Sequence, residues 1–203
     1  MTKNATAPAV PDIHPTESLM NAAERLLVAE GHAAISTRRV AEEAGLNHGL
    51  VHYYFGSMEE LLVQVLGRFT LRLIERQREM YAHAVPFIEK WRTAMSYLEA
   101  DEASGYQKLW FELQALSWNR PELRERVARV NAEWRTVVTE AFTVAACDYG
   151  IDTEAFPVSA VVSLVMTFNQ GIILERLCGV TDGQDELLNA IDQWLTSLEG
   201  GRT

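Results

Sequence analysis

The sequence predicts an all-α fold with about nine helices joined by short loops. Apolar residues recur with a helical period along nearly every long segment, and no segment alternates like a half-buried strand. Pro86, Pro121 and Pro157 fall near predicted helix starts, where a missing N–H costs little. With 203 residues, of which 48% are apolar, the chain can bury a core without disulfides or structural metals.

The beginning of the chain is expected to be a flexible arm followed by one amphipathic helix. Residues 1–15 form the arm, which is rich in Ala and Pro. Thr16 is placed to begin the helix, with Glu17 in its first turn, and Gly31 is placed to end it. The apolar residues between them share one helix face: Leu19, Met20, Ala23, Leu26 and Leu27.

The next segment fits two short helices joined by a tight turn. Ser36 is the expected N-cap of the second helix, and Gly45 can adopt the left-handed conformation that the turn needs. A third helix is expected over about residues 47–53, where Val51 would pack back toward the small Ala41. An ordinary corner between two helices without a ligand would show the same steric pattern.

A long fourth helix is expected from Met58 to about His83, with Ser57 as its cap. At 1.5 Å per residue it would be roughly 39 Å long, enough to run from one domain into another. Further helices are expected over 86–99, 103–118, 121–148, 155–178 and 184–199.

Residues 36–62, STRRVAEEAGLNHGLVHYYFGSMEELL, resemble the DNA-binding segment of the tetracycline-repressor (TetR) family of bacterial transcription regulators. The resemblance rests on Val40-Ala41, Ala44-Gly45, Gly49, Tyr54-Phe55, Ser57 and Glu60-Leu61, and on residues 19–31, which resemble the family's first helix. It implies a helix-turn-helix DNA-binding domain over 16–62. It also implies a helical ligand-binding and dimerisation domain over 63–203, which resembles the family only in length and helicity.

The resemblance implies that the third helix enters the major groove of DNA. His48 and Leu50 are the expected base contacts, since imidazole can hydrogen-bond a purine edge and Leu can touch a thymine methyl. Gly49 would let the backbone approach the DNA closely. Including contacts to phosphate, which position the protein without reading sequence, the expected DNA-binding residues are Ser36, Thr37, Arg38, Asn47, His48, Gly49, Leu50, His52 and Tyr53.

Two positions depart from the family's usual pattern. His52 stands where the family most often has Tyr, so a phosphate contact there could depend on pH. Met58 stands where a Lys usually contacts a phosphate, and losing that contact would remove about one unit of salt slope per subunit. The N-terminus of the fourth helix could still hold a phosphate through its N–H groups.

The charge of the chain argues against nucleic-acid binding at face value. The net charge is −10, and residues 1–56 hold four Lys+Arg against six Asp+Glu, whereas phosphate neutralisation drives DNA binding. Residues 47–55 carry no acid, and Glu42 and Glu43 could point away from the DNA. We therefore expect modest non-specific affinity and a greater reliance on the fit to one operator.

The last two predicted helices suit an interface between two copies of the chain. The final helix has a single apolar stripe, and the helix before it is apolar nearly all round. These two helices dimerise in the TetR family, while packing within one chain is the alternative. The expected dimerisation residues are Val161, Val165, Phe168, Ile172, Leu187, Leu188, Ile191, Trp194 and Leu195.

Aromatic residues concentrate between positions 81 and 142, and buried indole N–H groups need partners. A cavity lined by them, with Gln114, Asn169 and Glu175 as polar groups, would suit a small amphipathic ligand. Core packing is the alternative for each aromatic residue taken singly. The residues expected to bind the ligand are Trp110, Phe111, Gln114, Trp118, Trp134 and Asn169.

Other chemistry is weakly represented. His48 and His52 have the spacing of metal ligands on a helix, but the resemblance accounts for them, so no metal, cofactor or catalytic residue is expected. Cys147 and Cys178 cannot form a disulfide framework. No secretory signal is recognisable, and the apolar stretch 158–168 is too short to cross a bilayer, so we expect a cytoplasmic protein.

The sequence therefore predicts a homodimeric, ligand-responsive transcriptional regulator. The simplest form is a repressor that a small-molecule effector releases from double-stranded operator DNA, through a shift of the fourth helix. One alternative is a helical small-molecule-binding protein or enzyme that has lost DNA binding, which the acidic charge and Met58 favour. A DNA-binding protein with a filled core and no effector is another.

Overall fold

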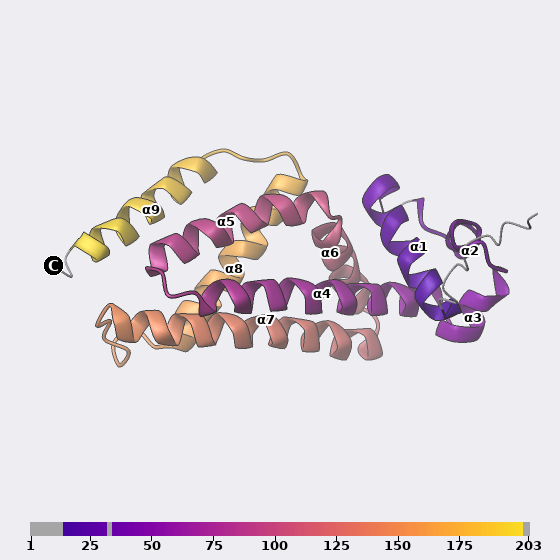
Figure 1. The fold of residues 1–203 in the computed structure, drawn as a ribbon, viewed down its shortest axis with the longest axis horizontal. Helices are drawn as coiled ribbons and strands as arrows, with labels where there is room; N and C mark the ends of the chain where they lie inside the picture. The colour runs from indigo at the N-terminus through magenta and orange to yellow at the C-terminus, as the bar shows by residue number, and fades with distance from the viewer. Residues whose placement is uncertain (1–13, 32–33, 201–203) are drawn as a thin grey trace, which may run out of the picture. The chain divides into compact units, whose positions relative to one another are not determined.

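The computed structural model describes residues 14–31 and 34–200, and these residues form nine α-helices and no strand (Figure 1). The expected all-α class is confirmed. Most of the arm expected over 1–15 lies outside the described residues. The chain divides between Leu62 and Val63 into two compact units.

The first unit contains the three short helices expected from the sequence, at nearly the expected positions. Ser36 caps the second helix, since its Oγ accepts a hydrogen bond from Arg39 N at 3.2 Å. Gly45 ends that helix in the left-handed conformation, with φ of 68°. The helices are α1 (Pro15–Glu30), α2 (Thr37–Ala44) and α3 (Gly49–Phe55).

The third helix begins two residues later than the expected start at residue 47. The side chain of Asn47 accepts a hydrogen bond from Gly49 N at 2.8 Å, so this residue caps the turn before α3 instead of lying within it. Ala41 and Val51 are buried, as the steric pattern of the turn requires. The core of the first unit consists mainly of Leu19, Ala22, Ala23, Leu26, Leu27, Val40, Ala41, Val51 and Phe55.

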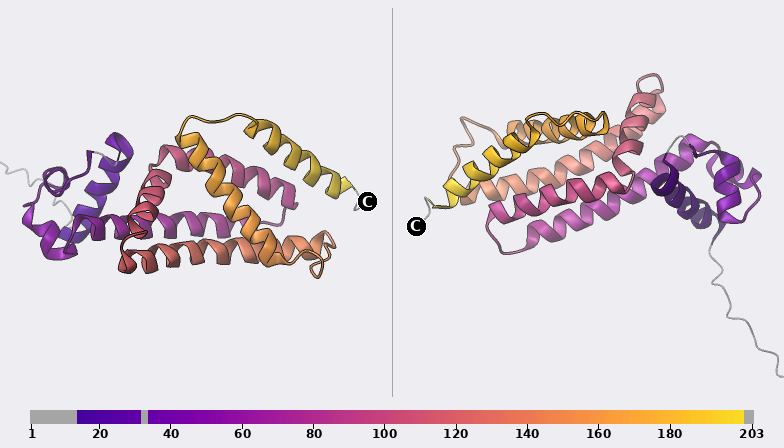
Figure 2. Two further views of the ribbon diagram at one scale, coloured as in Figure 1. Left: turned by 180° about the vertical axis from the view of Figure 1, so that it is seen from behind. Right: turned by 90° about the horizontal axis from the view of Figure 1, so that it is seen from above.

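The helix α4 (Met58–Ala82) begins in the first unit and continues in the second. Ser57 Oγ accepts a hydrogen bond from Glu60 N at 3.0 Å, so the expected cap is confirmed. The second unit continues with α5 (Phe87–Ala103), α6 (Tyr106–Ser117), α7 (Pro121–Asp148), α8 (Val158–Leu177) and α9 (Gln184–Gly200). Within this unit, α4, α5 and α7 run roughly alongside one another, and α8 crosses them obliquely (Figures 1 and 2).

The last helix packs against α5 and contributes to a core cluster of the second unit. Arg92 on α5 and Asp192 on α9 reinforce this contact with a bidentate ion pair, at 2.7 Å and 2.8 Å. The buried members of the cluster are Phe87, Ile88, Trp91, Ala145 and Leu195.

The helix α8 is rich in apolar residues, and most of its side chains are half-buried. Among the described residues it is the one helix long and apolar enough to cross a membrane, with a mean hydropathy of 1.5 and 11% of that window buried. We expected the apolar segment 158–168 to be too short to cross a bilayer, and this was wrong about length, because the apolar helix continues to Leu177.

Candidate nucleic-acid interface and ligand cavity

The helix α3 has a buried side and an accessible side. Val51 and Phe55 are buried and hold the helix against the rest of the first unit. On the accessible side, Tyr53 is 79% exposed and His48 is exposed, while Leu50 is half-buried. The residues expected to contact bases can therefore be reached from solvent.

Two of the expected DNA contacts already bond within their own unit. Asn47 Oδ1 accepts a hydrogen bond from Gly49 N, which fixes the side chain against its own backbone. His52 Nδ1 lies 3.1 Å from Gly56 O. A carbonyl oxygen only accepts, so Nδ1 carries the proton, and the neutral ring then offers only an acceptor at Nε2. A phosphate also only accepts, so a His52–phosphate bond requires the doubly protonated ring.

The N-terminal end of α2 holds the other expected phosphate contacts. Ser36 is exposed and its hydroxyl keeps a proton to donate after capping the helix. Thr37 is half-buried beside it. Arg38 is exposed, but its Nε bonds Glu42 Oε1 at 2.7 Å.

Every arginine described in the first unit pairs with an acid of the same unit. Glu42 and Glu43 bond these arginines, because each lies within reach of a guanidinium on α1 or α2. That they point away from the DNA stays a prediction. The hydrogen bond to Arg38 lowers the pKa of Glu42, and the same contact raises the pKa of Arg38. The pairs are Arg25–Glu43 at 2.9 Å, Arg38–Glu42 at 2.7 Å and Arg39–Glu30 at 2.6 Å.

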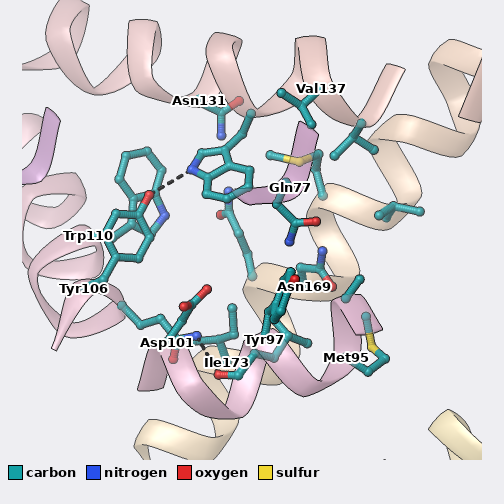
Figure 3. Close-up of a pocket in the computed structure, with 18 of the residues that line it drawn as sticks. Gln77, Met95, Tyr97, Asp101, Tyr106, Trp110, Asn131, Val137, Asn169 and Ile173 are labelled. Carbon is teal, nitrogen blue, oxygen red and sulfur yellow. Dashed lines mark hydrogen bonds between the residues drawn. The ribbon is translucent and has the colours of Figure 1, made fainter. Parts of the chain in front are cut away.

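A cavity of about 130 Å³ lies inside the second unit, between α4, α5, α6, α7 and α8 (Figure 3). Of the residues expected to bind a ligand, Trp110, Phe111, Trp134 and Asn169 line this cavity. The aromatic residues of its wall are Tyr81, Trp91, Tyr97, Tyr106, Trp110, Phe111, Trp134 and Phe142.

Three expected polar or aromatic members of the cavity lie elsewhere. Trp118 is 70% exposed, because it follows the last residue of α6 and projects into solvent. Gln114 does not line the cavity, although its Nε2 is buried without a hydrogen-bond partner. Glu175 is exposed and accepts a hydrogen bond from Gln184 at 3.0 Å.

The cavity also contains polar residues that the sequence analysis did not single out. Asp101 is its one charged lining residue, and Arg76 binds both carboxylate oxygens, at 2.9 Å and 2.8 Å. The guanidinium also stacks on Tyr97, 3.9 Å from the ring centre. Burial raises the pKa of Asp101, and the bonds from Arg76 offset part of that rise. These residues are 25 positions apart on different helices, so no local pattern connects them.

A buried hydrogen-bond chain joins the cavity wall to α4. Trp134 Nε1 donates to the Tyr106 hydroxyl at 2.8 Å, the dashed bond in Figure 3. The same hydroxyl lies 3.3 Å from Thr70 Oγ1, and Thr70 is fully buried. Burial raises the pKa of Tyr106, so its hydroxyl stays protonated and available for this chain. The chain gives the indole N–H of Trp134 the partner that it needs.

Two carboxamide oxygens at the cavity have no hydrogen-bond partner. Gln77 Oε1 from α4 and Asn169 Oδ1 from α8 are both buried and unbonded. Figure 3 shows that the two side chains extend into the same part of the cavity. An unsatisfied buried acceptor costs about 1–3 kcal/mol, so a bound donor would recover free energy here.

The exposed apolar residues of α8 and α9 match those expected at a dimer interface only in part, at Leu187 and Trp194. Ile172 and Leu195 are each 5% exposed and packed within their own chain, so we remove them from that set. Val165 lines the cavity instead. Phe168, Leu188 and Ile191 pack against the core cluster, and Val161 is half-buried. The large apolar side chains left exposed on these two helices are Leu164, Leu174, Leu187 and Trp194.

Comparisons with known proteins match one segment of the chain to a described family. Residues 19–65 match the family model described as bacterial regulatory proteins, tetR family. The chain is 26% identical over 98 residues to an uncharacterized HTH-type transcriptional regulator from Haemophilus influenzae. That match covers 48% of this chain and 46% of the relative, so it spans about half the length of each.

Solved structures share the fold over nearly the whole chain. A transcriptional regulator from Rhodococcus sp. RHA1 superposes with a TM-score of 0.74 at 19% identity, covering 91% of this chain and 94% of that one. FadR from Bacillus subtilis, solved with stearoyl-CoA, superposes with a TM-score of 0.69 at 16% identity, covering 88% and 96%. A TetR-family regulator from another Rhodococcus sp. gives 0.67 at 22% identity, covering 88% and 96%. The helix-turn-helix segment of this chain, residues 19–65, is therefore that of the tetR family of bacterial regulatory proteins, and the chain shares its fold with solved transcriptional regulators.

Proposed function

We propose that this chain is a homodimeric transcriptional regulator whose first unit binds double-stranded operator DNA. The observation that carries the proposal is the accessible side of α3, with His48 and Tyr53 exposed while Val51 and Phe55 anchor the helix from behind. A short helix supported in this way can enter a major groove with its N-terminal residues toward the bases. The match of residues 19–65 to the tetR family model supports the same function.

The exposed apolar residues of α8 and α9 support dimerisation. Leu164 and Leu174 on α8 and Leu187 and Trp194 on α9 would be covered by the same two helices of a second copy. Such a two-fold pairing would present two α3 helices to successive major grooves, roughly 34–36 Å apart.

The cavity supports regulation by a small-molecule effector that releases the regulator from its operator. The wall of the cavity includes Gln77 on α4, and the buried chain from Trp134 ends at Thr70 on the same helix. A ligand in contact with this wall can therefore act on the helix that begins at Met58, beside the DNA-binding segment. A coupling of about 1–3 kcal/mol between ligand and DNA would suffice, and it must be reciprocal.

A small-molecule-binding protein without DNA affinity is the competing function, and the arginine pairing favours it. With Arg25, Arg38 and Arg39 all engaged by acids, the described part of the first unit offers no unpaired arginine or lysine to phosphate. Exposed ion pairs of this kind contribute about 0–1 kcal/mol, however, so phosphate can displace them.

Titration of the full-length protein against DNA from the region upstream of its own gene tests the proposal. We expect a saturable complex whose affinity falls with salt, and a footprint with two-fold symmetry and half-sites one helical turn apart. A scrambled fragment of the same length is the control. Equal binding to both fragments, or no complex at low salt, would support the competing function.

A further inference from the structure

We infer that the ligand of this cavity is an uncharged single-ring aromatic molecule that carries a hydroxyl group, such as a simple phenol. The inference rests on the proposed function only where it calls this ligand the effector. The ligand class itself is argued from the volume of the cavity, its walls and its unsatisfied polar atoms.

The size of the cavity limits the ligand to about one ring. Its volume is about 130 Å³, and an apolar protein cavity of about 150 Å³ is known to accommodate benzene. Drug-sized and cofactor sites usually occupy roughly 300–1,000 Å³. The stearoyl-CoA bound by FadR of Bacillus subtilis is therefore a poor guide to the ligand of this chain.

The wall favours an aromatic ligand without charge. Eight aromatic side chains contribute to it, and their faces and edges suit stacked or edge-to-face contact with another ring. The carboxylate of Asp101 is the one charge on the wall, and Arg76 binds both of its oxygens. An ionic ligand would lose its hydration without gaining an unpaired counter-charge.

The polar groups of the wall favour a hydroxyl at one edge of the ring. Five carboxamides line this cavity. Gln107 donates a hydrogen bond to Leu98 O, and Asn131 accepts one from Arg135 Nε. The oxygens of Gln77 and Asn169 are buried and unbonded. A hydroxyl can donate to one carboxamide oxygen and accept from the nitrogen of the other, so it suits this pair even if one amide turns over.

The cavity adjoins a second space in the same unit. A second and more open hollow of about 680 Å³ lies among α4, α5, α7 and α9. Tyr81 and Val137 line both spaces, so these two side chains form the wall between them. A change of rotamer at Tyr81 would connect the hollow with the cavity.

Binding of four single-ring probes to the full-length protein tests the inference. Phenol and toluene have the same shape but differ in the hydroxyl, while benzoate and benzylammonium add a negative or a positive charge. Calorimetry and quenching of Trp110 and Trp134 fluorescence report binding. We expect phenol to bind about tenfold more tightly than toluene, and both charged probes to bind at least tenfold more weakly than phenol.

Replacement of the unbonded amides makes the test specific. Gln77→Leu and Asn169→Leu, made separately, should each remove most of the preference for phenol over toluene. Gln114→Leu is the matched control, because it removes a buried amide of the same unit that does not line the cavity. It should keep the preference.

The inference is overturned if phenol binds no better than toluene, if a charged probe binds best, or if Gln114→Leu changes the preference as much as the two cavity variants. The promoter titration is independent of these outcomes. Phenol selectivity without operator binding would contradict the proposed function alone, and operator binding without phenol selectivity would contradict the ligand class alone.

Discussion

The two units of this chain differ in whether the polar groups at their candidate binding sites already have partners. In the first unit, the described arginines are all satisfied by neighbouring acids at the surface. In the second unit, two carboxamide oxygens are buried beside a cavity and have no partner. A phosphate that binds an arginine of the first unit must therefore displace an existing ion pair, whereas a ligand of the second unit can donate a hydrogen bond to an acceptor that has none.

This difference indicates where binding free energy should come from. Exchanging an exposed arginine–carboxylate pair for an arginine–phosphate pair yields little net energy, so operator affinity must depend on the fit of α3 to the bases. Satisfying a buried acceptor yields more, so a small ligand can compete with DNA for control of the protein.

The largest predicted effect concerns the one charged residue of the cavity wall. Arg76→Met should reduce the free energy of unfolding by about 2–4 kcal/mol at pH 8, because it leaves the Asp101 carboxylate buried without its counter-ion. Chemical denaturation measures the loss. The double variant Arg76→Met/Asp101→Asn should recover most of it.

The pH dependence of the same variant follows from the pKa of Asp101, which burial raises in the folded protein. Below the ordinary Asp pKa the carboxyl is neutral in both folded and unfolded chains, so the penalty is absent. The loss of stability develops as pH rises through the higher folded-state pKa of Asp101, because the buried carboxyl must then ionise without its counter-ion. A loss of stability that is the same at pH 4 and pH 8 would contradict this explanation.

The next effect concerns the exposed apolar face of the second unit. Trp194→Glu should raise the dimer dissociation constant about 30-fold or more, because a large aromatic residue at the centre of an interface commonly contributes 2 kcal/mol or more. Analytical ultracentrifugation measures the constant. Val144→Glu on α7 is the matched control, since Val144 and Trp194 are both 57% exposed. Equal effects of the two variants would place the interface elsewhere.

The smallest predicted effect concerns the ion pairs of the first unit. Glu42→Gln frees Arg38 and should strengthen operator binding about two- to fivefold, with a steeper salt dependence of affinity. Glu17→Gln makes the same change in charge on α1, where the structure gives Glu17 no ion pair with Arg38. A gain of equal size from both variants would indicate a general charge effect in place of a released arginine.

The sequence predicted the parts of the fold that depend on neighbouring residues. The caps at Ser36 and Ser57 and the left-handed Gly45 act within a few positions of the chain, and the structure confirms all three. The start of α3 was misplaced because Asn47 could belong either to the helix or to its cap, and only the side-chain bond to Gly49 decides between them.

The cavity could be predicted only in part. An excess of aromatic residues indicated that a cavity exists, and Trp110, Trp134 and Asn169 do line it. Gln77 and Asp101 were missed because the side of a helix that faces a cavity depends on how distant helices pack. Trp118 was chosen for its chemistry, although its place after the end of α6 exposes it.

The most direct test of the account compares operator and random DNA for variants at two places in the first unit. Leu50→Ala or His48→Ala on α3 should weaken operator binding about tenfold and leave binding to random DNA unchanged, because these residues are proposed to touch bases. Thr37→Val, at one of the proposed phosphate contacts, should weaken both by the same factor. Loss of random-sequence binding in the α3 variants, or operator binding that they do not change, would contradict the account.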